Sequence, residues 1–367
     1  MKFSCDKKTL SDATFNVSLA VSSKSTLVAL EGVLLSCDGN ELTLTGYNLD
    51  LGITKNIDVK GQENGSIVLN AKLFSDILRK MNSDQITIHV DDKMVTTIVG
   101  NGTEFTILGI NANEFPEMPT QKDENCFSIP CHLLKNMITQ TIFSVALTEQ
   151  TPIHTGSLFD VKDGVLNIVS VDGYRLAKRS EKIDINDEFS FVVPGNTLRE
   201  IIKLLPEEED ISVNILYSNR HIIFDIDGYT VTSRLLDGEF LNYRSSISDE
   251  HLTRIKINVK NFISSIERAS IIITDRIKSP IKCVFEEETA AISCETAMGK
   301  FNDSIEVSID GNGILIGFNN RYLLEALKAC ECDEVYLDIN GPLLPMKIVP
   351  LESDSFLFLV LPVRLAG

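Results

Sequence analysis

Apolar and polar positions follow the same order three times along this chain of 367 residues. Each time, a short apolar run leads into a stretch whose apolar residues stand three and four positions apart, the spacing of an amphipathic helix. The strand and helix pairs are Ile67–Asn70 with Ala71–Met81, Phe191–Pro194 with Gly195–Leu205, and Ile314–Gly317 with Asn320–Cys330. A repeat of this length predicts three related domains.

The aligned helices share charged columns as well as apolar ones. An acid stands at Asp76, Glu200 and Glu325, and a base follows three residues later at Arg79, Lys203 and Lys328. Arg79 and Lys203 lie 124 residues apart, and Lys203 and Lys328 lie 125 apart. A second set of strands begins near Phe3, Phe127 and Ile255 and precedes the helix patterns Lys7–Ala20, Cys131–Phe143 and Val259–Ile271. Strand and helix can recur by chance, but shared columns with one period favour related domains.

The predicted domains span residues 1–121, 122–246 and 247–367, with boundaries in the polar, turn-rich segments 120–124 and 245–250. Most other segments, such as Gln85–Val90, Val95–Val99 and Thr103–Leu108, alternate apolar and polar residues between turn signals. Each domain is therefore expected to contain two helices and several antiparallel strands. That is an α+β fold with helices on one side of the sheets.

Composition indicates a globular protein of the cytoplasm. Hydrophobic residues make up 43% of the chain, which excludes global disorder. No apolar run has the length of a membrane span, and the first residues lack the apolar stretch of a signal peptide. The eight cysteines form no C-x-x-C pair, so we expect reduced packing residues rather than disulfides or a zinc site.

The distribution of charge complicates a simple view of the chain as acidic. Its net charge is −18, which repels nucleic acid unless basic residues are concentrated in one place. The six predicted helices together carry +7. Singly, each has the charge of an ordinary solvated face. As a set, they favour a shared surface that holds phosphates loosely and without sequence readout.

Catalytic motifs are scarce in this sequence. It contains no G-x-G-x-x-G, Walker A, H-E-x-x-H or G-x-S-x-G pattern, and we predict no cofactor and no metal. One acid–base candidate combines Asp172, Tyr174 and Arg175 with His154. The alternative is a turn at Asp172-Gly173 between two strands, with Arg175 in a salt bridge.

The C-terminal segment is almost wholly apolar from Phe356 to Leu365. Through Val360 it is typical of a buried strand. Pro362 cannot donate to a strand ladder, yet apolar residues continue beyond it. Leu361, Pro362 and Val363 are therefore either plain core or the lining of an exposed apolar groove.

Several of these stretches resemble one known family, the bacterial DNA sliding clamps, the beta subunits of replicative DNA polymerase. The resemblance covers the whole chain. It rests on Thr45–Asp50, Glu114–Pro116, Asp172–Ala177, Leu236–Phe240, Gly317–Asn319 and Leu361–Leu365. It implies a head-to-tail homodimer of three-domain chains, closed into a ring with helices lining the hole and sheets outside.

The resemblance also implies a function without catalysis. The ring would encircle double-stranded DNA independently of sequence and tether the DNA polymerase catalytic subunit. The clamp loader and repair proteins would dock through short apolar peptides, and no membrane is involved. The residues that correspond to the family's DNA contacts are Lys24, Lys72, Arg79, Lys135, Arg199 and Lys203.

The family's peptide groove and dimer contact are carried over in the same way. The groove positions are His154, Val171, Gly173, Tyr174, Arg175, Leu176, Leu241, Pro345, Met346, Val360, Leu361, Pro362, Val363 and Arg364. The dimer contact would pair Phe105 and Ile107 of one chain with Ile271 and Ile272 of the other.

The sequence departs from the family pattern in places. His154 and Leu241 replace a Leu and a Pro, and Ser245 and Ser246 stand where an Arg and a Val are common. Two alternatives to the clamp remain at this point. One is an enzyme that uses Asp172, Arg175 and His154. The other is a scaffold whose groove binds peptides without encircling DNA.

Overall fold

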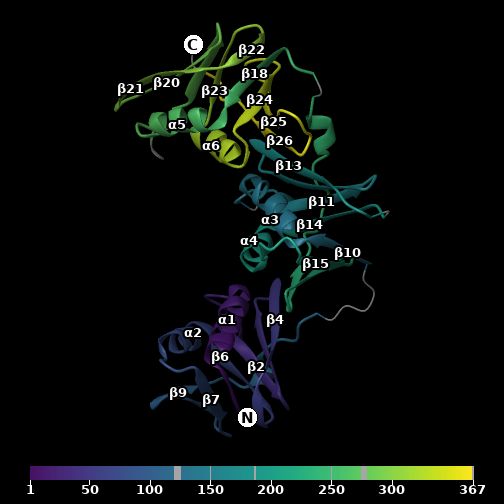
Figure 1. Ribbon diagram of the computed structural model, residues 1–367, viewed down its shortest axis with the longest axis vertical. Coiled ribbons are helices and arrows are strands. Elements are labelled where there is room, and N and C mark those ends of the chain that lie inside the picture. Colours follow the sequence, from purple (N-terminus) through teal and green to yellow (C-terminus); the bar gives the residue numbers. More distant parts are fainter. Residues whose placement is uncertain (120–124, 149, 186, 249, 274–278, 366–367) are drawn as a thin grey trace. The chain divides into compact units, whose positions relative to one another are not determined.

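A computed structural model describes residues 1–119, 125–148, 150–185, 187–248, 250–273 and 279–365 (Figure 1). They form two compact units. The first unit comprises Met1–Leu134 and Asn196–Leu235, and the second comprises Lys135–Gly195 and Leu236–Gly367. The domain boundary predicted at 120–124 lies outside the described residues.

All six predicted helices are confirmed in the described part of the chain. They are α1 (Lys7–Val17), α2 (Ala71–Lys80), α3 (Cys131–Thr139), α4 (Gly195–Leu204), α5 (Val259–Ser270) and α6 (Asn320–Lys328). The α3 helix ends four residues before the predicted Phe143, because the Thr141 hydroxyl donates to the carbonyl of Met137 and a 3-10 turn at Ile142–Ser144 follows. The 3-10 turn continues the spacing of apolar residues beyond the end of α3, so the sequence pattern predicted a longer helix.

Short polar side chains fix where four of these helices begin. Asp6, Asn70, Asn258 and Asn319 each accept hydrogen bonds from backbone N–H groups in the first turn of α1, α2, α5 and α6, respectively. Such caps satisfy donors that have no partner inside the helix. The same device therefore recurs in corresponding positions of the first and third repeats.

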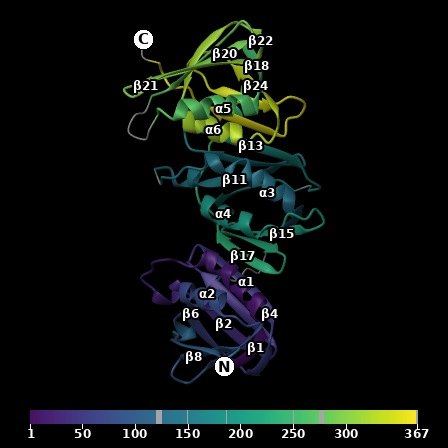
Figure 2. The ribbon, with the colours of Figure 1, turned by 60° about the vertical axis from the view of Figure 1, so that its left-hand side comes forward.

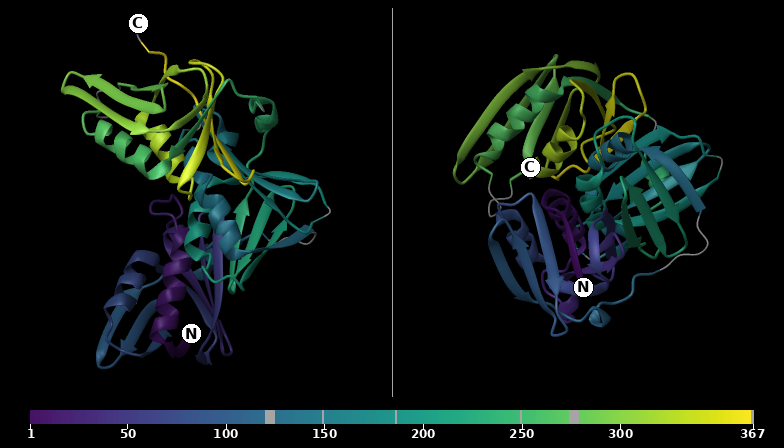
Figure 3. Two further views of the ribbon diagram at one scale, coloured as in Figure 1. Left: turned by 45° about the horizontal axis from the view of Figure 1, so that its top comes forward. Right: turned by 60° about the horizontal axis from the view of Figure 1, so that its bottom comes forward.

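The first unit contains two antiparallel sheets. One has the order β5 (Lys60–Glu63), β1 (Lys2–Asp6), β7 (Gln85–Val90), β8 (Val95–Gly100), β9 (Thr103–Leu108). The other has the order β10 (Asn125–Pro130), β15 (Ser212–Tyr217), β16 (His221–Ile226), β17 (Tyr229–Arg234), β4 (Leu51–Asp58), β3 (Glu41–Tyr47), β2 (Gly32–Asp38), β6 (Gly65–Asn70). Helices α1 and α2 lie side by side, and α1 packs on β3 and β4 (Figure 3).

Strands of two different repeats meet in the eight-stranded sheet. Strand β17 of the middle repeat pairs with β4 of the first, with Tyr229 opposite Lys55. The Lys55 ammonium lies 4.3 Å from the centre of the Tyr229 ring, and Asn16 donates to the Tyr229 hydroxyl at 2.8 Å. Continuous pairing across this junction explains why the middle repeat divides between the two compact units.

The second unit has the same design. Its larger sheet has the order β14 (Phe189–Pro194), β11 (Gly156–Lys162), β12 (Val165–Val171), β13 (Arg175–Lys182), β26 (Phe356–Val360), β25 (Met346–Pro350), β24 (Glu334–Ile339), β18 (Thr253–Asn258), β22 (Ser308–Gly311). The smaller has the order β21 (Gly299–Glu306), β20 (Thr289–Thr296), β19 (Ile281–Glu286), β23 (Ile314–Phe318). Helices α5 and α6 lie side by side (Figure 2). Their apolar faces share a core with both sheets.

The eight cysteines are free, as predicted, and six of them are buried. Burial raises the pKa of Cys283 to about 12, so its thiol stays protonated. Cys332 is half-buried and packs against the core of the second unit, whereas Cys126 is exposed, so the expectation that all eight are packing residues is wrong for Cys126. In the part of the chain described, no helix is long and apolar enough to cross a membrane.

Candidate functional site

The segment Asp172–Arg175 is a tight turn between β12 and β13. Asp172 Oδ1 accepts hydrogen bonds from the backbone N–H of Tyr174 at 2.9 Å and of Arg175 at 3.1 Å. Gly173 has φ +88°, a conformation that favours glycine. Asp172 also pairs with the Arg175 side chain at 2.9 Å. The prediction of a turn with a salt-bridged arginine is therefore confirmed, and Asp172 is engaged as a structural acceptor.

Arg175 is the most constrained side chain of this site, with only 4% of its surface exposed. Besides Asp172, its guanidinium donates to Glu325 on α6. It also lies over the rings of Tyr322 and Phe143, with centroid distances of 4.6 and 5.4 Å. Burial works to raise the pKa of Glu325, but its bonds to Arg175 and Arg321 outweigh this and lower it. The carboxylate is therefore ionised at neutral pH and holds Arg175 in place.

The C-terminal segment combines the two alternatives that its sequence left open, plain core and an exposed apolar surface. Strand β26 lies between β13 and β25, with Val360 opposite both Arg175 and Met346, and Val360 and Met346 are buried. Beyond it, Leu361 is 39% exposed and Val363 is 38% exposed. The segment is core through Val360 and then an exposed apolar surface.

Backbone hydrogen bonds hold that exposed segment against two other elements. Leu361 N donates to the Tyr174 carbonyl at 2.9 Å, and Val363 N donates to the Gly317 carbonyl at 2.8 Å. Tyr174, 59% exposed, stacks on Tyr322 with ring centroids 5.7 Å apart. Pro362 is half-buried, and Gly173 and Arg364 are exposed. The structure thus brings the turn and the C-terminal residues of the predicted groove together.

The remaining groove positions border a second apolar cluster in the same unit. Val171 and Leu176 are buried in it together with Leu359. His154 stands at its edge, with its ring 5.4 Å from that of Phe240. Leu241 is 40% exposed. Pro345 is half-buried and lines a cavity of about 720 Å³ together with Leu359.

His154 introduces a polar group into this apolar surface. Burial lowers the pKa of its imidazole below the usual 6.5. The ring is therefore neutral at pH 7 and compatible with apolar neighbours. Its side chain makes no hydrogen bond within the described residues, so its nitrogens are available to a bound molecule.

The six predicted DNA contacts occupy helices and one loop. Lys24 is an exposed loop residue, and Lys72 in the first turn of α2 lines a cavity of about 480 Å³ beside Ser22 and Ser23. Lys135 on α3 and Arg199 on α4 are half-buried, and Arg199 donates to Asn196 at 3.1 Å. Lys135 belongs to the second unit and the other five to the first. Because Ser22 and Ser23 precede Lys24 and line the same cavity as Lys72, the structure brings the Lys24 loop together with Lys72.

Arg79 and Lys203 each have a carboxylate neighbour on their own helix. Arg79 pairs with Asp76 at 2.5 Å, and Lys203 pairs with Glu200 at 2.7 Å. Both pairs are exposed to solvent and span three residues. A phosphate would have to compete with these acids, which favours weak contacts.

The four predicted dimer residues lie at the margins of the two units. Phe105 and Ile107 are half-buried on β9, the edge strand of the five-stranded sheet. Ile271 follows α5 and is 76% exposed. Ile272 is half-buried and packs against the core of its own unit.

Comparison with known proteins decides the family. Models of the N-terminal, central and C-terminal domains of the DNA polymerase III beta subunit match residues 1–119, 128–242 and 244–364, respectively. The chain belongs to the DNA polymerase III beta subunit family. Such a subunit is a DNA sliding clamp that tethers the polymerase and has no catalytic activity of its own. Family membership therefore removes the enzyme alternative.

Individual DNA polymerase III beta subunits agree over the full length. The beta sliding clamp of Bacillus subtilis is 32% identical over 377 residues, covering 99% of this chain and 100% of the relative. The crystal structure of a putative beta subunit from Eubacterium rectale has 33% identity and a TM-score of 0.96, with 100% of both chains covered. The crystal structure of the Bacillus subtilis clamp has 31% identity and the same TM-score, 0.96, again with both chains fully covered.

Two residues that shape the site were not among the predictions. Glu325 is the partner of Arg175, and Tyr322 supports both Arg175 and Tyr174. Glu325 was visible only as a member of the acidic column. Its role depends on a contact 150 positions away in the sequence, for which local patterns carry no signal.

Proposed function

We propose that two copies of the chain close head to tail into a ring around duplex DNA and hold the polymerase and the clamp loader through the apolar groove. The exposed apolar pair Leu361 and Val363 is the main observation that supports the groove. Backbone hydrogen bonds fix both to neighbouring elements, so the surface is formed before any partner arrives. A preformed pocket lowers the ordering cost of binding anchor side chains.

Unpaired sheet edges support the ring contact. Among the described strands, β9 pairs only with β8, and β21 pairs only with β20. An exposed strand edge is a template for pairing with another chain. We propose that β9 of one copy, with Phe105 and Ile107, meets the α5 end of the other, with Ile271 and Ile272. Two different surfaces then meet at each junction, an arrangement that closes by rotation.

The helices supply the surface for DNA. We propose that Lys24, Lys72, Arg79, Lys135, Arg199 and Lys203 contact phosphates. The pairing of Arg79 and Lys203 with carboxylates supports contacts weak enough to permit sliding. We also propose domain limits of 1–121, 122–246 and 247–367 for the three clamp domains. We place the ring in the cytoplasm, where bacterial DNA is replicated.

The groove is tested by fluorescence anisotropy with a labelled apolar clamp-binding peptide. Leu361→Asp places a charge in the groove, and we expect peptide affinity to fall at least ten-fold. The control is Met298→Asp, a change of another exposed apolar residue in the turn between β20 and β21. Equal affinity of Leu361→Asp and the wild-type chain would refute the assigned groove.

Encirclement is tested by loading the chain onto nicked circular DNA. A ring stays on the circle and slides off after linearisation. A peptide-binding scaffold that does not encircle DNA gives no retention on either form. The two results separate the ring from the scaffold without reference to the groove.

A further inference from the structure

A cavity of about 720 Å³ adjoins the proposed groove on the side of the connector between the second and third repeats. The connector contributes Ser248, Glu250 and Leu252 to its lining, and Leu344, Pro345 and Leu359 line it as well. Leu359 stands opposite Leu176 of the groove in the pairing of β26 with β13. Pro345 is itself a groove position. The cavity therefore continues the groove.

Two charged residues that line this cavity, Asp338 and Lys347, already have partners. Asp338 is buried and accepts from Arg254 at 2.6 and 2.9 Å. Lys347 lies 3.2 Å from the same carboxylate and donates to the Ser248 carbonyl at 3.0 Å. Burial works to raise the pKa of Asp338, but these cations outweigh it and lower the pKa. Asp338, Arg254 and Lys347 are thus paired with one another, whereas the buried Nδ1 of His251, which also lines the cavity, has no hydrogen-bond partner within the described residues.

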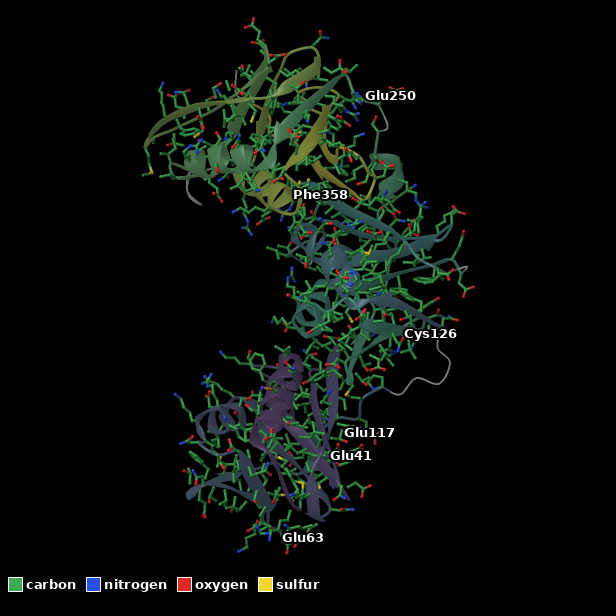
Figure 4. The ribbon with its side chains drawn as sticks, viewed as in Figure 1. Glu41, Glu63, Glu117, Cys126, Glu250 and Phe358 are labelled. Atoms are coloured by element: carbon green, nitrogen blue, oxygen red, sulfur yellow. The ribbon has the colours of Figure 1, made fainter. Side chains whose placement is uncertain are left out.

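Glu250 is different because its backbone is fixed while its carboxylate is not engaged. Its N–H donates to the Ser248 hydroxyl at 3.2 Å, and its carbonyl accepts from Asn340 at 2.8 Å. Within the described residues, the side chain makes no hydrogen bond or ion pair, and it is exposed on the connector (Figure 4). The cavity is therefore bordered by a carboxylate that no cation among the described residues pairs with.

We propose that this cavity receives the part of a bound partner peptide that flanks its apolar anchors, and that it selects a lysine or arginine there. This inference rests on the proposed groove. Leu252 and Leu344 are 71% and 51% exposed and offer apolar contact to the aliphatic stem of such a side chain. The Glu250 carboxylate meets its cationic head, as long basic side chains commonly arrange themselves. Charge complementarity of this kind adds specificity and raises the association rate.

The experiment compares labelled peptides that share the apolar anchors. One has the anchors alone. The others carry a Gly-Arg-Lys or a Gly-Glu-Glu extension at either the N- or the C-terminal end. Anisotropy at 50 mM NaCl should show one Arg-Lys peptide binding about two- to five-fold more tightly than its Glu-Glu counterpart, the range for an exposed ion pair. The difference should shrink at 500 mM NaCl, because salt screens exposed charges.

Variants assign that preference to one side chain. Glu250→Gln should abolish it and leave the anchor-only affinity unchanged, because the backbone contacts of Glu250 remain. Glu306→Gln on β21, a matched change of another exposed acid, should retain the preference. If the anchor-only peptide fails to bind the wild-type chain, the groove itself is wrong. If it binds and the preference is absent, reversed or retained in Glu250→Gln, the selection by this cavity is refuted while the groove stands.

Discussion

Arg175 on β13 and Glu325 on α6 join the turn beside the groove to the helix pair of the third repeat. Arg175 is buried and binds both Asp172 and Glu325, while Glu325 also accepts from Arg321 at 2.9 Å. A strand of the middle repeat is thereby fixed to a helix of the next one. The groove lies at this junction, so its shape depends on an ion pair between repeats.

This ion pair also breaks the regularity of the acidic column. In α2 and α4, the acid pairs with the base three residues later. In α6, the corresponding acid is Glu325, which Arg175 and Arg321 share, and the base Lys328 pairs with Glu267 of α5 at 2.6 Å. The acid therefore pairs within its own helix in the first two repeats, whereas in the third repeat it also pairs with Arg175 of a distant strand.

Glu325→Gln should lower the free energy of unfolding by about 1.5 kcal/mol, the lower range for a hydrogen bond to a charged group, because Glu325 is 31% exposed. Peptide affinity should fall with it, since Arg175 loses a support. Glu267→Gln, which breaks an exposed pair, is the control and should cost less than about 0.5 kcal/mol. Urea denaturation measures both, and equal losses would contradict the special role of Glu325.

The same pair predicts a pH dependence. The pKa of Glu325 is lowered from 4.5, so its stabilising effect is complete above that value and disappears as the pH falls through the lowered one. The stability difference between wild type and Glu325→Gln should therefore be constant from pH 8 to pH 5.5 and vanish in stronger acid. A difference that grows on acidification would have the wrong sign.

Removal of Asp76 should strengthen the hold on DNA. Asp76→Asn frees Arg79 from its carboxylate neighbour, so retention on circular DNA should survive higher salt. Arg79→Gln combined with Lys203→Gln should have the opposite effect and leave peptide binding unchanged. Salt titration of DNA retention measures both directions. Parallel loss of DNA retention and peptide binding in the double variant would instead indicate misfolding.

Ile271→Arg should separate the ring into monomers. Ile271 is 76% exposed in the single chain, so the substitution costs the isolated fold little. At the proposed contact, the arginine would be buried without a partner, which is strongly unfavourable. Sedimentation velocity should report monomers for Ile271→Arg and dimers for Leu147→Arg, whose original side chain is 75% exposed. A dimer of unchanged stability in Ile271→Arg would move the interface elsewhere.

Peptide binding should weaken as the pH falls below neutrality. Burial already lowers the pKa of His154 from 6.5, and a bound apolar peptide buries the ring further. The neutral ring is therefore favoured in the complex. Peptide affinity should fall about three-fold between pH 7.5 and pH 5.5, which is less than the roughly ten-fold change that a one-unit shift in pKa on binding would give. Anisotropy at the two pH values tests this. His154→Leu should bind equally at both, because that variant lacks the imidazole whose protonation opposes binding.

Much of the fold could be predicted from local patterns. The three repeats, the six helices and strands such as β7 and β9 follow from spacing of apolar residues, because each element must bury one face whatever its partner. The turn at Asp172–Arg175 was equally legible, since an Asp-Gly pair between two strands specifies it locally. The end of α3 was missed because a 3-10 turn continues the apolar spacing.

The repeated order of strands and helices and the turn beside the groove are written in local residue patterns. The pairing of Arg175 with Glu325, the exposure of Leu361 and Val363 next to the buried Val360, and the unengaged carboxylate of Glu250 beside a cavity became visible only in the folded chain. The two groups differ in the sequence distance over which the interactions act. Periodicity records which face of an element is buried, but ion pairs and exposure depend on segments that are distant in the chain and meet only after folding.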